Sequence, residues 1–371
     1  MCHKEMDNNI KVRNMKNKEK RILFLISSLG GGGAERVICR IASELSKKHH
    51  VYLLYNEHKP HTYCIDPAVH LIACLTRKTS VDNNIIQWLS GKYNVLKRLI
   101  MVTAVRYKYN IDTTVSFLRG PNILNVMAGG KCRKIVSDRN DPSCKDEYYR
   151  KRALFVNQRA DHVVFQTRRV QGMYPEDVRR KSSVIVNPTE VSCMAADVKS
   201  KKIVTVGRLH EQKNQKMLLK AFSLYHKSHP DYHLYFYGEG ELLQELMQAA
   251  RNYNLSRCVH FEGFKEDIHE AIADAEQFVL SSDYEGLPNA LMEAMMMGLA
   301  CISTACNGSE VLIDHEQNGL LVPVGDAETL GKAMCRLSDE PRLRDRLGKA
   351  AALSAQEWKT ERVVRLWERI L

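Results

Sequence analysis

The fold is decided by the stretch RILFLISSLGGGGAERVI at residues 21–38. Its first half is a continuous apolar run, which is typical of a buried parallel strand. The four glycines at residues 30–33 follow directly, and a helix is predicted for residues 34–48. A second strand is predicted for residues 50–55. A strand, a glycine turn, a helix and a strand form a βαβ unit, so the chain is expected to build a parallel sheet covered by helices.

The same alternation continues along the chain in two arrays. In the first array, further strands are predicted for residues 111–118, 134–137, 162–166 and 183–186, and helices for residues 84–109 and 146–159. In the second array, strands are predicted for residues 203–207, 233–237, 259–261, 278–281, 301–304 and 319–322, and helices for residues 214–229, 241–253, 268–275, 288–297, 327–338, 341–352 and 360–371. Asn187-Pro188 breaks the pattern between the arrays, and a polar stretch at 190–200 predicts a linker.

The predicted fold class is therefore α/β, with two Rossmann-like doubly wound domains that face each other across a cleft. A basic flexible leader is expected at residues 1–20. The first domain is expected to span residues 21–190 and the second residues 191–371. The last helix of the second domain is placed so that it can cross back to the first.

Composition and charge restrict the function. The chain has 371 residues, of which 44% are apolar and 26% charged, so a disordered chain and a small disulfide-stapled fold are excluded. No run of 18 apolar residues is present, which argues against a transmembrane helix. The net charge is +12, but residues 1–190 hold 34 Lys and Arg against 17 Asp and Glu, whereas the remainder holds 21 against 26. The basic half predicts an anionic partner, such as nucleic acid, an anionic membrane surface or a phosphorylated substrate.

The eleven cysteines are odd in number and irregularly spaced. Residues 1–20 are polar and rich in lysine, without the apolar core of a secretory signal. Reduced thiols in a cytoplasmic protein are the simplest interpretation. Cys301 and Cys306 are interpreted as core residues at a strand end rather than as metal ligands.

The first candidate motif is the glycine loop with Gly32, Gly33 and Glu35. Glycines between a strand and a helix allow a ligand to approach the backbone, and a helix N-terminus favours an anion. The dinucleotide fingerprint G-x-G-x-x-G fails in both registers, because Glu35 and Arg36 stand where the third glycine is needed. A plain tight turn is the alternative.

The second candidate motif lies at residues 206–214, where a strand ends and a helix begins near Asn214, a suitable N-cap. Arg208 and Lys213 therefore lie in a loop at the carboxyl end of a parallel strand, where open α/β sheets bind ligands. Two cations in this place suit a diphosphate. A solvated charged loop explains the same residues equally well.

The third candidate motif lies at residues 282–293, where Pro288 fits the first turn of a helix. Glu285 precedes that helix, and Glu293 lies within it, in a position to receive ribose hydroxyls. The backbone N–H groups near Gly286 and Leu287 form an anion site. Ordinary helix-start chemistry is the alternative.

Taken together, these motifs resemble the glycosyltransferase family 4 group. The resemblance spans about residues 21–330, is dense in the second half and is carried in the first half mainly by the glycine loop. The matching segments are Gly32-Gly33-Ala34-Glu35, Gly207-Arg208-Leu209 with Gln212-Lys213-Asn214, Glu285 followed by Glu293, and Gly308-Ser309-Glu310 ahead of Asn318-Gly319-Leu320-Leu321-Val322-Pro323.

The resemblance implies a GT-B fold and a retaining transferase that needs neither a metal nor another cofactor. The sequence agrees on the metal, because it contains no D-x-D motif. Arg208 and Lys213 would bind the donor diphosphate and stabilise the leaving charge. Glu285 would position the transferred sugar, and Glu293 would bind ribose hydroxyls. The other donor-binding positions implied are Gly207, Gly263, Phe264, Gly286 and Leu287, with Gly263 and Phe264 flanking the base.

In the first domain, Gly32 and Gly33, with Glu35 in the same loop, would let the backbone approach the phosphates and the acceptor. Many relatives carry a His in the loop that here reads Ser-Asp-Arg-Asn-Asp-Pro at residues 137–142. Arg139 and Asn140 stand in its place, as in many polysaccharide-building members, so no His is assigned a catalytic role. The departing phosphate oxygen can take the acceptor proton instead. Asp138, Arg139 and Asn140 are candidates for acceptor contacts.

The implied function is transfer of a hexose or N-acetylhexosamine from a nucleotide sugar, with a UDP-sugar favoured, to a glycan or a polyprenyl-pyrophosphate-linked acceptor in surface polysaccharide or glycolipid synthesis. The apolar and cationic stretch at residues 93–108 suits an anionic leaflet, which would place the protein peripherally on the cytoplasmic face. Packing of that helix on the sheet is the alternative. A nucleotide-sugar 2-epimerase of the same fold is the nearest enzymatic rival, and a non-catalytic nucleotide- or surface-binding protein is another. The failed fingerprint disfavours a dehydrogenase, and no nucleic-acid module is recognised.

Overall fold

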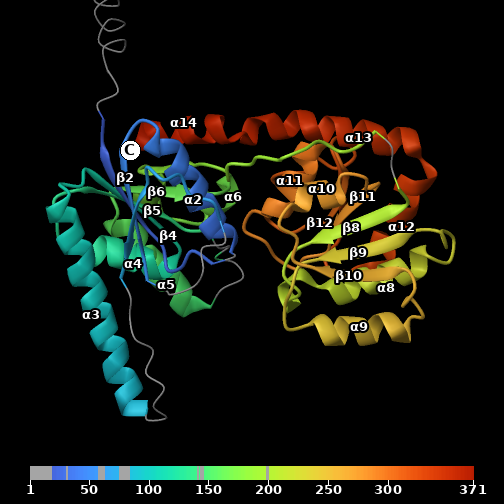
Figure 1. Ribbon diagram of the computed structural model, residues 1–371, viewed down its shortest axis with the longest axis horizontal. Coiled ribbons are helices and arrows are strands. Elements are labelled where there is room, and N and C mark those ends of the chain that lie inside the picture. The colour runs from blue at the N-terminus through green and yellow to red at the C-terminus, as the bar shows by residue number, and fades with distance from the viewer. Residues whose placement is uncertain are drawn as a thin grey trace, which may run out of the picture. The chain divides into compact units, whose positions relative to one another are not determined.

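The computed structural model describes residues 19–30, 32–56, 63–74, 84–139, 142, 146–197 and 200–371. Contacts divide the chain into two compact units. The first comprises the chain up to Asp138 together with Phe155–Val164 and Glu368–Leu371, and the second comprises Arg139–Leu154 and Phe165–Trp367. Two separate parallel sheets flanked by helices are present (Figure 1), so the predicted α/β class is confirmed.

The first sheet has the strand order β3-β2-β1-β4-β5-β6-β7. Strands β1 to β6 pair in parallel, with β1 between β2 and β4. The strands are β1 (Arg21–Leu25), β2 (His50–Tyr55), β3 (His70–Ala73), β4 (Thr113–Phe117), β5 (Arg133–Ser137), β6 (His162–Phe165) and β7 (Ser182–Val184). The associated helices are α2 (Gly33–Ser46), α3 (Asn84–Lys108), α4 (Arg119–Met127), α5 (Glu147–Arg159), α6 (Arg168–Gly172) and α7 (Glu176–Arg179).

The second sheet has the order β10-β9-β8-β11-β12-β13, and all of its neighbouring strands pair in parallel. Its strands are β8 (Lys202–Val206), β9 (His233–Tyr237), β10 (Val259–Gly263), β11 (Gln277–Leu280), β12 (Ala300–Thr304) and β13 (Leu320–Val322). The helices that follow are α8 (Gln215–Tyr225), α9 (Leu243–Asn252), α10 (Ile268–Ile272), α11 (Asn289–Met297), α12 (Ala327–Asp339), α13 (Pro341–Ser354) and α14 (Thr360–Ile370).

Two apolar layers hold the second sheet between its helices. One layer joins the sheet to α8, α9 and α12, and the other joins it to α10, α11 and the end of α13. Figure 1 shows α8 and α9 on one side of the strands and α10 and α11 on the other. This sandwich presents the loops after the strands at one edge of the sheet.

Two elements of the first unit were not predicted from the sequence. The edge strand β3 is largely exposed and therefore has no apolar pattern. Helix α4 contains Gly120-Pro121, which favours a turn in sequence. Pro121 lies in the first turn of the helix, where a missing N–H removes no helical hydrogen bond, so the helix tolerates it.

The nine cysteines that the structure describes are free thiols. Cys301 and Cys306 are buried at β12 and just beyond it, which confirms their interpretation as core residues. Within the described ranges, no three His, Cys, Asp or Glu side chains gather in a way that would hold a metal ion. No helix in the described part of the chain has the length and apolar character needed to span a membrane.

Candidate functional site

The strand order of the second sheet has a switch point between β8 and β11. From β8 the chain proceeds to β9 on one side, and from β11 it proceeds to β12 on the other. Open parallel sheets bind ligands at such a point, beyond the carboxyl ends of the strands. The loop after β8 carries Gly207, Arg208 and Lys213, and the loop after β11 carries Glu285. The topology therefore brings two of the predicted motifs to one edge.

Lys213 and Glu285 form an ion pair at this switch point. The Lys213 ammonium lies 2.5 Å from Oε1 of Glu285, and the two side chains are only 17% and 9% exposed. The same carboxylate accepts hydrogen bonds from the Ser282 hydroxyl at 2.7 Å and from the Gln212 amide at 3.4 Å. A cation and a carboxylate are thus fixed side by side at the switch point. Ser282 and Gln212 were not predicted to support the site.

The loop after β8 is shaped so that the Lys213 side chain can return to the strand end. A Cβ on Gly207 would lie 3.3 Å from Cε of Lys213, so glycine gives this side chain room. A 3₁₀ turn over Glu211–Lys213 follows, and α8 begins after Asn214. The Asn214 side chain accepts a hydrogen bond from the Met217 N–H at 3.2 Å, which confirms the predicted N-cap.

Arg208 differs from its neighbour Lys213. It is exposed, and its side chain makes no hydrogen bond or ion pair with any residue that the structure describes. Its guanidinium is therefore available to an anion from solvent.

The loop after β11 is packed tightly at Gly286. A Cβ on Gly286 would lie 2.6 Å from the Arg139 carbonyl oxygen, and a Cβ on Gly308 would lie 2.6 Å from the Gly286 carbonyl oxygen. Both positions therefore require glycine. Helix α11 begins at Asn289, and Pro288 occupies the N-cap position, one residue earlier than its predicted place inside the helix.

Glu293 is buried in α11, with 5% of its surface exposed. His269 of α10 lies against it, with Nε2 3.4 Å from Oε2 of Glu293. The sequence contains no signal for this contact, because the residues are 24 positions apart on two helices.

Gly263 is the last residue of β10, and Phe264 follows it at the same edge of the sheet. Gly263 has φ +69°, a left-handed conformation that favours glycine. The Phe264 side chain is 64% exposed. An exposed aromatic ring here is suited to stacking, and its predicted contact with a base stays a prediction.

Arg139 lies in a buried polar cluster that Asn187 connects. The Arg139 guanidinium donates to Oδ1 of Asn187, which also accepts from the Gln166 amide at 2.8 Å. The Asn187 amide in turn donates to Oδ1 of Asn289 at 2.5 Å and to the Leu287 carbonyl at 3.5 Å. Asn187 thus joins Arg139 to the start of α11, a role that the sequence, which indicated only a break at this position, did not reveal.

Burial lowers the pKa of Arg139 to about 9, so the guanidinium stays cationic at neutral pH. Asp138, the residue before Arg139, is buried and belongs to the first unit. Asn140, the third predicted acceptor contact, lies outside the described residues.

The glycine loop lies at the corresponding switch point of the first sheet, between β1 and β4. Gly32 is the N-cap of α2, and Gly33 is its first residue. The Glu35 side chain folds back so that its Oε2 lies 2.1 Å from where a Cβ on Gly32 would be, and it accepts from the Ser28 hydroxyl at 3.2 Å. Leu118, just after β4, has φ +71°, which is rare for a branched residue.

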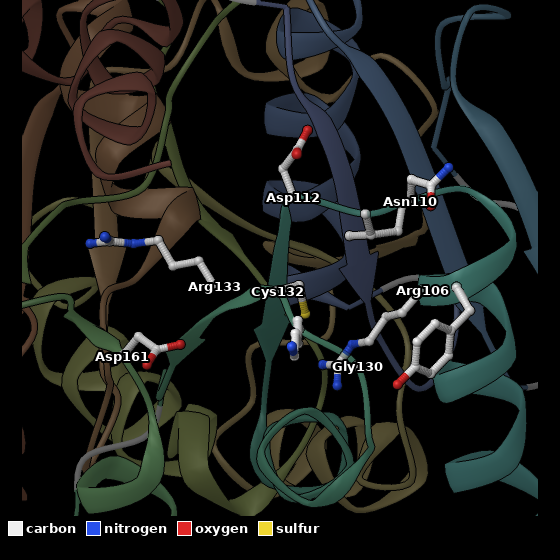
Figure 2. Close-up of a pocket in the computed structure, with 10 residues that line it drawn as sticks. Arg106, Asn110, Asp112, Gly130, Cys132, Arg133 and Asp161 are labelled. Carbon is white, nitrogen blue, oxygen red and sulfur yellow. The ribbon is translucent and has the colours of Figure 1, made fainter.

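A pocket of about 930 Å³ lies elsewhere, at the amino edge of the first sheet. Figure 2 shows it between Arg106 and Asn110 on one side and Arg133 and Asp161 on the other. Arg106 donates to the carbonyls of Asn125, Ala128 and Gly129 at the end of α4, so it stabilises that helix terminus. None of the residues that line the pocket was predicted as a site residue.

Residues 193–354 match the family model described as Glycosyl transferases group 1. This segment contains the switch-point loops of the second sheet with Arg208, Lys213, Glu285 and Glu293. The chain is 26% identical to the N-acetylgalactosamine-N,N'-diacetylbacillosaminyl-diphospho-undecaprenol 4-alpha-N-acetylgalactosaminyltransferase of Campylobacter jejuni, over 93% of this chain and 98% of that protein.

A second sequence relative and a solved structure are also similar to this chain. The chain is 32% identical to the UDP-Gal:alpha-D-GlcNAc-diphosphoundecaprenol alpha-1,3-galactosyltransferase of Escherichia coli, over 36% of each protein. Its structure is similar to Anabaena Alr3699/HepE in complex with UDP and glucose, with a TM-score of 0.78, 16% identity, and coverage of 95% of this chain and 99% of that one. The second comparison concerns the fold alone.

Proposed function

We infer the reaction from the premise that this chain is a glycosyltransferase of the two-domain GT-B fold. We propose that it transfers a hexose or N-acetylhexosamine from a nucleotide sugar, with a UDP-sugar favoured, with retention at the anomeric carbon and without a metal. The observation that carries the proposal is the Lys213–Glu285 pair at the switch point, in which the carboxylate is buried and the ammonium partly buried. It places a cation for a diphosphate beside a carboxylate for sugar hydroxyls.

Lys213 and Arg208 bind the donor diphosphate and stabilise the charge that grows on it as it leaves. The bond between the anomeric carbon and the diphosphate oxygen breaks, and the acceptor hydroxyl oxygen bonds to the same face of that carbon. The acceptor proton passes to the departing phosphate oxygen, so no protein base is needed. The absence of a D-x-D motif in the sequence supports the metal-independent form of this step.

Glu285 accepts hydrogen bonds from hydroxyls of the transferred sugar, and Ser282 and Gln212 hold its carboxylate in place. The backbone at Gly286 and Leu287 binds phosphate or sugar oxygens. Glu293 receives the ribose hydroxyls. The exposed ring of Phe264, next to Gly263, flanks the base.

We assign residues 21–190 to the acceptor side and residues 191–371 to the donor side. The acceptor is a glycan or a polyprenyl-pyrophosphate-linked glycan, used in surface polysaccharide or glycolipid synthesis. Two observations support this class: the basic first half, and relatives whose names specify undecaprenol-diphosphate-linked substrates. Two loops would contact the acceptor. One holds Gly32, Gly33 and Glu35, and the other holds Asp138, Arg139 and Asn140.

A membrane-facing surface on α3 fits such an acceptor. Tyr93, Leu96, Ile100 and Tyr107 follow one another at intervals of three, four and seven residues, and all are more than half exposed. They lie on the helix face opposite Val102, which is buried against the sheet. Figure 1 shows α3 extending well beyond the strands of its unit. With Lys92 and Lys97 on the same helix, this face suits an anionic leaflet and a peripheral position on the cytoplasmic side.

The donor is tested by thermal unfolding with UDP, GDP, ADP, CMP and NAD and with the corresponding nucleotide sugars. A true ligand at 100 times its dissociation constant stabilises the protein by about 2.7 kcal/mol. We expect the largest shift with UDP or a UDP-sugar, and turnover that survives EDTA. A shift with NAD alone, or turnover abolished by EDTA and restored by a divalent cation, would overturn the proposal.

Membrane contact is tested by co-sedimentation with vesicles of phosphatidylcholine and phosphatidylserine, which present a negatively charged surface, and with vesicles of phosphatidylcholine alone. We expect pelleting at low salt and release as salt rises, since surface attraction is screened over ~8–10 Å. Leu96→Ser with Ile100→Ser should weaken pelleting without changing the melting temperature, because both side chains are exposed. Salt-independent pelleting, or none, contradicts the proposal.

A further inference from the structure

We propose that His269 is a positioning residue for the nucleotide ribose, because it holds the Glu293 carboxylate in the orientation that receives the two ribose hydroxyls. The inference rests on the proposed role of Glu293. It adds a residue outside every motif that the sequence indicated, from a short helix, α10.

The partners of His269 determine where its proton lies. Its Nδ1 is 3.1 Å from the backbone nitrogen of Ser192, which has a hydrogen to donate. The Ser192 hydroxyl is also 3.2 Å from Nδ1, but it donates to Oδ1 of Asp267 at 3.0 Å. Nδ1 is therefore an acceptor, and the neutral ring carries its hydrogen on Nε2.

The hydrogen on Nε2 faces the carboxylate of Glu293, at 3.4 Å from Oε2. Both side chains are buried, with 7% of His269 and 5% of Glu293 exposed. A buried carboxylate requires hydrogen-bond donors, and a ring fixed at its other nitrogen is a rigid one. The backbone N–H of Ser192 thus fixes the orientation of the His269 ring, and the ring fixes the orientation of the Glu293 carboxylate.

The kind of donor also matters for recognition. In its neutral form, the imidazole donates one hydrogen bond from Nε2 without placing a positive charge beside Glu293, whereas a Lys or Arg in its place would add one. The carboxylate therefore remains a strong acceptor, and its two oxygens match two adjacent hydroxyls. Glu293 also belongs to α11, the helix that follows the switch-point loop with Glu285. The His269–Glu293 pair therefore serves the ribose of a nucleotide whose diphosphate lies at that loop.

Two substitutions at His269 separate its two contacts. In His269→Asn, the shorter amide retains an acceptor for the Ser192 N–H but does not reach Glu293. In His269→Gln, the longer amide places an N–H near the position of Nε2 and retains the donor to Glu293. A residue that only fills space would be affected similarly by both changes.

The readout is a ratio of dissociation constants measured by titration calorimetry. The Kd of the 2′-deoxynucleoside diphosphate is divided by the Kd of the ribonucleoside diphosphate. The probe is whichever of UDP, GDP and ADP binds the wild type most tightly, with its 2′-deoxy form. A hydrogen bond to a charged group changes affinity roughly tenfold or more, so we expect a wild-type ratio of about 10. The ratio should fall toward 1 in His269→Asn and should be largely restored in His269→Gln.

The control is His229, another histidine that lies between a serine and a carboxylate in the same unit. Its Nε2 is 3.0 Å from Oδ1 of Asp339, and its Nδ1 is 3.0 Å from the Ser228 hydroxyl. His229→Asn should leave the ratio at the wild-type value. KM for the donor should rise in His269→Asn with a smaller change in kcat, because the ribose is remote from the reacting bond.

Glu293→Gln distinguishes failure of the inference from failure of the proposed function. If Glu293→Gln leaves the ratio unchanged, Glu293 does not bind the ribose, and both statements are rejected. If Glu293→Gln lowers the ratio but His269→Asn does not, or if Asn and Gln at 269 behave alike, His269 is not the positioning residue. If none of the nucleoside diphosphates binds, the donor proposal and this inference are both overturned.

Discussion

Replacement of Lys213 tests whether its ammonium acts on the donor diphosphate or only holds Glu285. Lys213→Met keeps the apolar length of the side chain and removes the charge. In the structure the ammonium lies 2.5 Å from the Glu285 carboxylate, and both groups are mostly buried. The variant therefore leaves a buried carboxylate with the Ser282 hydroxyl and the Gln212 amide as its remaining donors.

The cost to stability follows from that burial. Removal of one partner of a fully buried ion pair lowers the free energy of unfolding by about 3–5 kcal/mol, and the partly buried Lys213–Glu285 pair is expected at the low end of that range. Two hydrogen bonds remain on Glu285, so we expect about 3 kcal/mol for Lys213→Met. Glu285→Gln leaves an ammonium that water reaches more easily, and about 1–2 kcal/mol is expected. The loss of unfolding free energy in the double variant should be smaller, by about 2 kcal/mol, than the sum of the losses in the two single variants.

Turnover should behave differently from stability. Loss of a cation that stabilises the leaving diphosphate lowers kcat about 10²–10³-fold. If Lys213 acts on the diphosphate, Lys213→Met should lower turnover to a similar extent in the wild type and in Glu285→Gln. Unfolding in urea, followed by circular dichroism, gives the stabilities. Release of nucleoside diphosphate from the donor, measured below the unfolding range, gives the turnover.

One outcome would refute the reasoning. If the double variant turns over the donor as fast as Glu285→Gln alone, then Lys213 acts only through Glu285, and its assignment to the diphosphate is wrong. Arg208 would then be the remaining cation of the switch-point loop to which the leaving charge is assigned.

Arg208, Gly286, Asn187 and the cysteines provide four further tests. Arg208→Ala should lower turnover about 10²-fold and change stability by less than about 0.5 kcal/mol, since the side chain is exposed; unchanged turnover would remove Arg208 from the mechanism. Gly286→Ala should lower the melting temperature and turnover, because its Cβ would lie 2.6 Å from the Arg139 carbonyl oxygen, whereas Gly172→Ala, with nothing within 4 Å, should do neither. Asn187→Ala should destabilise the protein by about 2–4 kcal/mol in urea, because it removes partners from Arg139, Gln166 and Asn289 together; a loss below about 0.5 kcal/mol would show that the cluster is not coupled. Iodoacetamide at pH 8 should label the exposed Cys64 in the native protein and leave Cys39 unlabelled until urea is added. The reason is that burial raises the pKa of the Cys39 thiol to about 12. Labelling of Cys39 in the native protein, detected by peptide mapping, would contradict this.

The fold was predictable because its main signals are local. Buried parallel strands are continuous apolar runs, and β2 and β9 begin and end at the predicted residues. The two doubly wound sheets then follow from the alternation of strands and helices. The elements that were missed have physical causes. β3 is an exposed edge strand without an apolar pattern, and α4 has a proline in its first turn, where a helix accepts one. Helices α6 and α7 have only five and four residues, which is too short for a helical period to be recognised.

Only one feature of the candidate site was predictable from the sequence: the loops that follow neighbouring parallel strands lie close together. Residues that follow parallel strands meet at one edge, and the order of the second sheet brings the loops of Lys213 and Glu285 together. Contacts between side chains on separate helices have no such rule. His269 and Asn187 are therefore visible only in three dimensions, since each joins segments that are far apart in sequence.

Burial also distinguishes the two cations that the sequence could not separate. A solvated charged loop, the alternative for this segment, predicts exposed side chains. Lys213 does not fit that description, because it is 17% exposed and paired with a carboxylate that is more buried still. Arg208 does fit it, because its side chain is in solvent. The case for Lys213 thus has a structural basis independent of the motif, whereas the case for Arg208 depends on the turnover of Arg208→Ala alone.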